Sequence, residues 1–125
     1  MEKLWPCVLS LVLGLLLSAH LSACQSAASS QPLPDQCSRK SYQDSLVTKY
    51  IEQGAQQFSY LDPRWTQYCD SLIAICPNVA VAYREKAIPL IKDGKFAEAF
   101  ALENTAVALD PKRWLAYRGF LKCIF

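Results

Sequence analysis

Residues 80–113 read AVAYREKAIPLIKDGKFAEAFALENTAVALDPKR, and this stretch decides the fold. Apolar residues recur there at three- and four-residue spacing on both sides of Gly94, which is the pattern of helices. Gly94 can adopt the positive φ that ends a helix. Ala87, Ala99 and Ala106 are small where two helices would have to approach closely. The stretch therefore predicts a hairpin of two α-helices.

The same pattern returns 34 residues further along the chain. Ala82-Tyr83-Arg84 recurs as Ala116-Tyr117-Arg118, and Pro77 recurs as Pro111. Asp110 can cap the helix that follows, with Pro111 in its first turn, where no backbone N–H is needed. A third helix is therefore expected after the hairpin.

A helix-turn-helix unit of this period is the repeat of the tetratricopeptide family, and residues 80–113 resemble it closely. The matching positions are Tyr83, Ala87, Leu90, Gly94, Phe96, Ala99, Ala106, Leu109, Asp110 and Pro111. The unit departs from the family pattern at Lys86, where an apolar residue is usual, and at Glu103, where an aromatic one is usual. Pro89 removes the N–H that would bond to the Glu85 carbonyl, so a kink is expected in the first helix.

Upstream of the repeat, two further helices are predicted. Asp62 and Pro63 form another cap and first-turn pair. After them one helical face is marked by Trp65, Tyr68, Cys69, Leu72, Ile73 and Cys76. A helix from about residue 41 to 54 precedes this one, and the two together form a degenerate repeat.

The resemblance implies an all-α fold of tetratricopeptide-type repeats, an α-solenoid that is incomplete at the C-terminus. Residues 41–79 form the degenerate repeat, residues 80–113 the full repeat, and residues 114–125 the first helix of a further unit whose second helix is absent. Because repeat arrays need about three units to bury their core, we expect the chain to be a fragment of a longer array.

The first 23 residues are typical of an export signal. Lys3 supplies a positive charge, and residues 8–17 form an uncharged, mostly apolar run. As a helix this run would reach about 15 Å, half of a hydrocarbon core. It is therefore a signal segment rather than a membrane span. Residues 24–40 are mostly polar, small or proline-bearing, and we expect them to act as a flexible tether.

Leu21-Ser22-Ala23-Cys24 resembles the lipobox of bacterial lipoproteins. The resemblance implies that Cys24 is acylated and becomes the new N-terminus, so that the lipid anchors the chain to a membrane. Gln25 follows in place of the Asp that retains many such lipoproteins at the inner membrane, which favours the outer membrane. Two alternatives stay open: Cys24 is an ordinary cysteine and a conventional peptidase cuts after Ala28, or the segment remains uncleaved as an anchor.

Four cysteines follow Cys24, and their pairing is left open by the sequence. Cys69 and Cys76 lie on one predicted helix about 10 Å apart, too far to bridge, so both are expected to be small core residues. A disulfide from Cys37 to a helix is compatible with an exported protein. The four cysteines Cys37, Cys69, Cys76 and Cys123 include no CxxC pair, so no metal site is predicted.

Composition and residue types exclude several functions. Basic residues exceed acidic ones by two, so bulk charge gives no case for nucleic-acid binding. The single histidine, His20, lies in the expected signal, which excludes Ser-His-Asp and Cys-His catalysis in the mature chain. The sequence holds no phosphate loop and no recognisable pair of catalytic carboxylates. We therefore expect no enzyme activity and no cofactor.

The resemblance instead implies a binding module whose concave face takes a protein or peptide. The candidate residues of that face are Val81, Arg84, Ile88, Ile91, Lys92, Leu115, Arg118 and Lys122, with Phe125 at the end. Arg84 and Arg118 fill the same position in successive units and would favour an acidic ligand, although exposed arginines are commonly solvated charges. Two alternatives remain: a structural or assembly subunit of an envelope complex, and an accessory domain of a longer enzyme.

Overall fold

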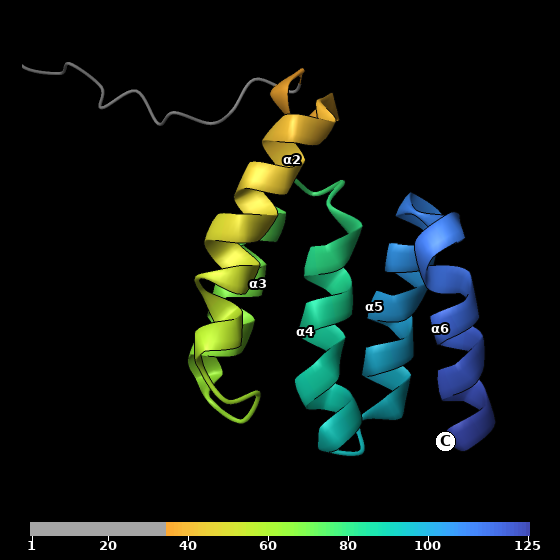
Figure 1. The fold of residues 1–125 in the computed structure, drawn as a ribbon. Coiled ribbons are helices and arrows are strands. Elements are labelled where there is room, and N and C mark those ends of the chain that lie inside the picture. Colours follow the sequence, from red (N-terminus) through yellow and green to blue (C-terminus); the bar gives the residue numbers. More distant parts are fainter. Residues whose placement is uncertain (1–34) are drawn as a thin grey trace, which may run out of the picture. The chain divides into compact units, whose positions relative to one another are not determined.

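The computed structural model describes residues 35–125. The predicted signal, Cys24 and most of the predicted tether lie outside the described residues. The described part is all-helical, as the sequence predicts (Figure 1). The longer helices are α2 (Lys40–Val47), α3 (Pro63–Ile75), α4 (Ala80–Lys92), α5 (Phe96–Leu109) and α6 (Pro111–Ile124), joined by the short turns η1 (Gln36–Ser38), η2 (Thr48–Glu52) and η3 (Ala55–Gln57).

Figure 1 shows α4, α5 and α6 as three neighbouring helices that alternate in direction, so that α4 and α6 run parallel. The turn between α4 and α5 contains Gly94 at φ 75°, as predicted. Ala87, Ala99 and Ala106 are fully buried or nearly so, which allows the three helix axes to lie close together. The helix α6 begins at Pro111, as the predicted cap at Asp110 implies, and so starts before the boundary at residue 114 that the repeat register gives.

The buried side chains form two clusters. The larger one joins η1, α2, η2 and α3 to the inner face of α4, and its members include Leu46, Ile51, Trp65, Leu72 and Ala82. The smaller one joins α4, α5 and α6 through Ala80, Ala106 and Trp114. Since α4 contributes to both clusters, it connects the N-terminal helices to the C-terminal ones.

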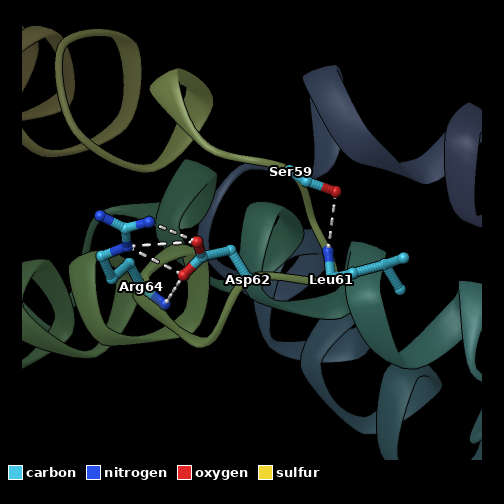
Figure 2. Close-up of polar contacts among 4 residues, drawn as sticks. All are labelled: Ser59, Leu61, Asp62 and Arg64. Carbon is cyan, nitrogen blue, oxygen red and sulfur yellow. Dashed lines mark hydrogen bonds and ion pairs between the residues drawn. The ribbon is translucent and has the colours of Figure 1, made fainter.

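Polar caps fix where α3 and α6 begin, and both were predicted. The Arg64 backbone N–H donates to Asp62 Oδ1 at 2.9 Å, and the Arg64 guanidinium pairs with the same carboxylate at 2.6 Å (Figure 2). These hydrogen bonds lower the pKa of Asp62 to about 2, so the cap keeps its charge in mild acid. Asp110 accepts from the Arg113 backbone N–H at 3.3 Å in the same way.

The helix predicted over residues 41–54 is shorter than expected. It runs as α2 to Val47 and then loosens into a π-type turn, η2. Gly54 follows at a point where η2 and α3 (Tyr68) approach closely, and a Cβ atom there would clash with the Tyr50 backbone carbonyl and the Tyr68 ring. This close approach lets the chain turn back so that α3 packs on η2 and η3.

A disulfide joins Cys37 to Cys76, whose Cα atoms are 5.5 Å apart. The expectation that Cys76 is an unpaired core residue was therefore wrong: Cys76 caps the end of α3, where the chain brings it against η1. Two amides, from Gln43 and Asn78, donate to the Cys37 carbonyl and hold this turn in place. Cys69 remains a buried thiol, as expected, and burial raises its pKa to about 12.

Pro89 lies inside α4, and the helix continues through it to Lys92. The carbonyl of Glu85, which Pro89 deprives of its helical partner, accepts a hydrogen bond from the indole N–H of Trp65 at 2.9 Å. This bond is buried, so without it the carbonyl would carry the full cost of an unpaired polar group. Pro89 thus leaves the Glu85 carbonyl of α4 free to accept a hydrogen bond from Trp65 of α3.

We predict that Trp65→Phe lowers the free energy of unfolding by about 1–3 kcal/mol, because it leaves the Glu85 carbonyl unpaired. In a Pro89→Ala background the N–H of residue 89 supplies the missing partner, so the same change should cost about 1 kcal/mol less. Urea denaturation of the four proteins measures this coupling.

The matched control is Trp114→Phe, since Trp114 is a buried tryptophan whose indole N–H has no partner in the described structure. Its effect should add to that of Pro89→Ala within about 0.5 kcal/mol. Equal costs of Trp65→Phe in both backgrounds would contradict the account.

Candidate functional site

An open apolar pocket of about 210 Å³ lies between α4 and α6. Its lining residues are Ile88, Ile91, Lys92, Tyr117, Phe120, Leu121, Ile124 and Phe125. The parallel course of α4 and α6 brings their C-terminal turns to the same end of the row (Figure 1), and this alignment places the two sets of side chains together. We call this pocket the α4–α6 groove.

The structure brings some of the predicted face residues together and separates others. Ile88, Ile91 and Lys92 line the α4–α6 groove together with Phe125. Val81 instead lines a second hollow of about 320 Å³ beside α2 and the start of α6. The side chains of Leu115 and Lys122 are exposed on α6 and line neither pocket.

Arg84 is used inside the fold rather than offered to a partner. Its Nη1 pairs with Glu85 Oε1 at 2.6 Å, and its guanidinium carbon lies 4.9 Å from the centre of the Tyr117 ring and 5.8 Å from that of Trp114. Cation–π contacts of this kind attract the ring faces of α6 to α4. The expected pairing of Arg84 with Arg118 on an open surface is therefore not found, and Arg118 is half-buried with its Nε enclosed.

Glu103 is a buried carboxylate on α5. Its side chain is 0% exposed, and neither carboxyl oxygen has a hydrogen-bond partner. Burial raises the pKa of Glu103 to about 7; the nearby Arg84 charge opposes this rise, and the Glu85 carboxylate adds to it. At neutral pH, Glu103 is therefore poised between its protonated and ionised forms.

Sequence reasoning missed this pair of buried carboxylates. Glu103 was visible as an acidic residue in a position that is usually aromatic, and Glu85 stands next to Arg84. What the sequence could not give is that Glu85 and Glu103, 18 positions apart on α4 and α5, face one arginine. Lys86, the other departure, pairs across to Asp70 on α3 at 2.5 Å.

Two properties of residues 35–125 bear on the kind of site that they can form. Within this range no group of three His, Cys, Asp or Glu side chains is placed to hold a metal ion. None of the described helices combines the length and the apolar character that crossing a bilayer requires. The α4–α6 groove is lined mostly by apolar side chains, with Lys92 among them.

No family model matches the chain, and neither the curated proteins nor the solved structures include a significant match.

The effect of Glu103→Gln on stability is predicted to depend on pH. A carboxyl whose folded pKa is raised stabilises the fold fully below its unfolded value of 4.5, and this stability is lost as the pH rises through 7. At pH 8 the neutral amide avoids the buried charge, so the variant should be more stable than the native protein by up to about 3 kcal/mol. At pH 5 the two should differ little.

Urea denaturation of both proteins at the two pH values measures this difference, and taking the difference cancels the titration of all other groups. Glu98→Gln, which changes an exposed carboxylate on the same helix, is the control and should show no such dependence on pH. A stability gap between native and Glu103→Gln that stays constant with pH would show that Glu103 is not protonated by burial.

Proposed function

We propose that the chain is a lipid-anchored lipoprotein of the bacterial cell envelope whose tetratricopeptide-type helices bind a protein or peptide segment in the α4–α6 groove. The observation that carries this proposal is the uncovered apolar lining of the groove. Phe120, Ile124 and Phe125 are each more than half exposed there, beside the aliphatic side chains of α4. Exposed apolar surface of this kind marks interaction sites in soluble domains.

The groove favours an apolar segment that also carries negative charge. Ile88, Ile91 and Leu121 provide its apolar walls, and Lys92 stands at its edge with no carboxylate partner in the described structure. A helix or extended peptide could insert one or two large side chains between α4 and α6 and place an acidic group near Lys92. In this proposal Lys92 attracts the acidic group, in place of Arg84 and Arg118, which the sequence analysis expected to do so.

The Cys37–Cys76 disulfide supports the exported location. Disulfides form and persist in oxidising compartments and are rare in the cytosol. Together with the lipobox-like residues around Cys24, it supports transport across the inner membrane, with the outer membrane as the favoured destination because Gln25 follows the cysteine. We further propose that α4 and α5 form one tetratricopeptide unit and that α6 begins the next.

A structural role is the second candidate. The exposed side chains on α6 would also suit a permanent contact inside an envelope complex, in which the groove is filled throughout the life of the protein. Transient binding predicts that the chain can be purified alone, whereas a permanent subunit should always co-purify with its complex.

The anchor is tested by growing expressing bacteria with an alkyne-bearing fatty acid and fractionating their membranes. The native chain should carry the label in the outer-membrane fraction, because the thiol of Cys24 is the expected acylation site. Cys24→Ala should abolish the label, and Cys123→Ser, which removes an exposed thiol elsewhere, should leave it unchanged. Label that persists in Cys24→Ala would contradict the assignment.

The groove is tested by photo-crosslinking in the same cells. A photoreactive residue at Ile91, inside the groove, should give a discrete crosslinked species, while one at Leu61, which is 77% exposed on the α3 side, should not. Lys92→Glu should weaken the Ile91 crosslink severalfold, since it repels an acidic partner. Crosslinks of equal yield from both positions would argue against a specific groove.

A further inference from the structure

The buried face of α5 contains a carboxyl group. The buried residues of this helix are Ala99, Glu103 and Ala106, whose spacing places them on one face. Ala106 packs with Ala80 of α4 and Trp114 of α6, so this face of α5 lies against the two helices that form the α4–α6 groove. Glu103 therefore occupies a position where an uncharged side chain is usual.

The enclosed polar atoms of α4, α5 and α6 have fewer partners than they need. Both carboxyl oxygens of Glu103, Oε2 of Glu85 and Nε of Arg84 are enclosed without a hydrogen bond. Among the described residues, the other enclosed side-chain atoms without a partner are Nε1 of Trp114 and Nε of Arg118, both on α6. Because each unpaired group costs free energy, a change of one charge can favour a different pairing within this part of the fold.

Two charges from α4 act on Glu103 in opposite directions. The Arg84 guanidinium favours the ionised carboxyl, and the Glu85 carboxylate disfavours it. On α6, the Tyr117 ring contacts Arg84, and the guanidinium of Arg118 is half-buried. Burial raises the pKa of Glu103 to about 7, so this carboxyl changes its charge near neutral pH.

Arg84 connects Glu103 to the α4–α6 groove. Its guanidinium carbon lies 4.9 Å from the centre of the Tyr117 ring, and Tyr117 lines the groove. The same guanidinium pairs with Glu85 Oε1 at 2.6 Å. An ionised Glu103 competes with Glu85 for Arg84, whose Nε has no other partner. A guanidinium drawn toward α5 attracts the Tyr117 ring less, and this loosens the α6 wall of the groove.

We propose that Glu103 is an acid-sensitive switch that sets how strongly the α4–α6 groove binds its ligand. With the carboxyl protonated, Arg84 pairs with Glu85 and holds Tyr117 against α4. With the carboxyl ionised, Arg84 shifts toward Glu103, and a further negative charge lies behind a groove that takes an acidic ligand. Both effects weaken binding as the pH rises. The inference rests on the proposed function, to which it adds a regulation.

Linkage gives the sign and the size of the effect. A ligand that prefers the protonated form raises the pKa of Glu103, and by reciprocity its own affinity falls as the carboxyl ionises. Each unit of that rise corresponds to a tenfold change in affinity once the pH lies well above the pKa. A rise of roughly one unit from a pKa of about 7 predicts about fivefold weaker binding at pH 8 than at pH 6.

The response of α6 is measured by fluorine NMR on the full-length protein in detergent micelles, with fluorinated tryptophan in place of tryptophan. The Trp114 ring centre lies 5.8 Å from the guanidinium carbon of Arg84, so the Trp114 signal reports the position of that group. This signal should shift between pH 5 and pH 9 with a midpoint of about 7. The Trp65 signal should move little, because its indole bonds to a backbone carbonyl, and shows that the fold is intact.

Two variants separate Glu103 from other titrating groups. Glu103→Gln cannot ionise, so its Trp114 signal should stay at the acid position at every pH. Glu98→Gln changes the other carboxylate of α5, which is exposed, and should leave the midpoint unchanged. A Trp114 signal that does not shift, or that shifts equally in Glu103→Gln, would overturn the proposal.

The effect on binding is measured with the photoreactive residue at Ile91, in isolated membranes equilibrated at pH 6 or pH 8 before irradiation. The native chain should crosslink severalfold more at pH 6, and Glu103→Gln should give that higher yield at both pH values. Equal native yields at the two pH values would overturn the link between Glu103 and the groove. No crosslink at either pH would count against the proposed function, and the Trp114 signal then tests the switch by itself.

Discussion

The hydrogen bond from the Trp65 indole to the Glu85 carbonyl is the contact on which the arrangement of the helices depends. Pro89 frees that carbonyl, and Trp65 is the donor from α3 that takes it. The side chain of the same glutamate pairs with Arg84, which in turn lies over aromatic rings of α6. Residues 84 and 85 thus link α3 to α6. The backbone carbonyl of Glu85 contacts α3, and the side chain of Arg84 contacts α6.

This linkage has an electrostatic cost that shapes the candidate site. Two buried carboxylates, Glu85 and Glu103, share the surroundings of one half-buried arginine, Arg84, so ionising both leaves a net negative charge there. Because Arg84 balances this charge, it is not free for a ligand, and Lys92 becomes the cation at the groove. Binding in the groove is therefore governed mainly by the apolar walls of α4 and α6, with charge adding selectivity.

The local features of the fold could be predicted from sequence because each depends on one or two residues. The caps at Asp62 and Asp110, the turn at Gly94 and the buried alanines all follow from backbone preferences and size. The contacts between distant segments could not be predicted in this way. The pairing of Cys37 with Cys76 and the partner of the Glu85 carbonyl depend on how α2, α3 and α4 pack, which no local pattern encodes. The same holds for the α4–α6 groove, since it depends on the parallel course of two helices.

The coupling between Arg84 and Glu103 tests most directly whether charge balance at Arg84 holds α4, α5 and α6 together. The measurement is a double-mutant cycle at pH 8 with Arg84→Met, Glu103→Gln and the double variant, using free energies of unfolding from urea denaturation. The account predicts that Arg84→Met costs at least about 1 kcal/mol less in the Glu103→Gln protein, because the amide no longer needs an opposing charge. Additive effects of the two changes would contradict it and would leave Arg84 as a partner of Glu85 and the aromatic rings alone.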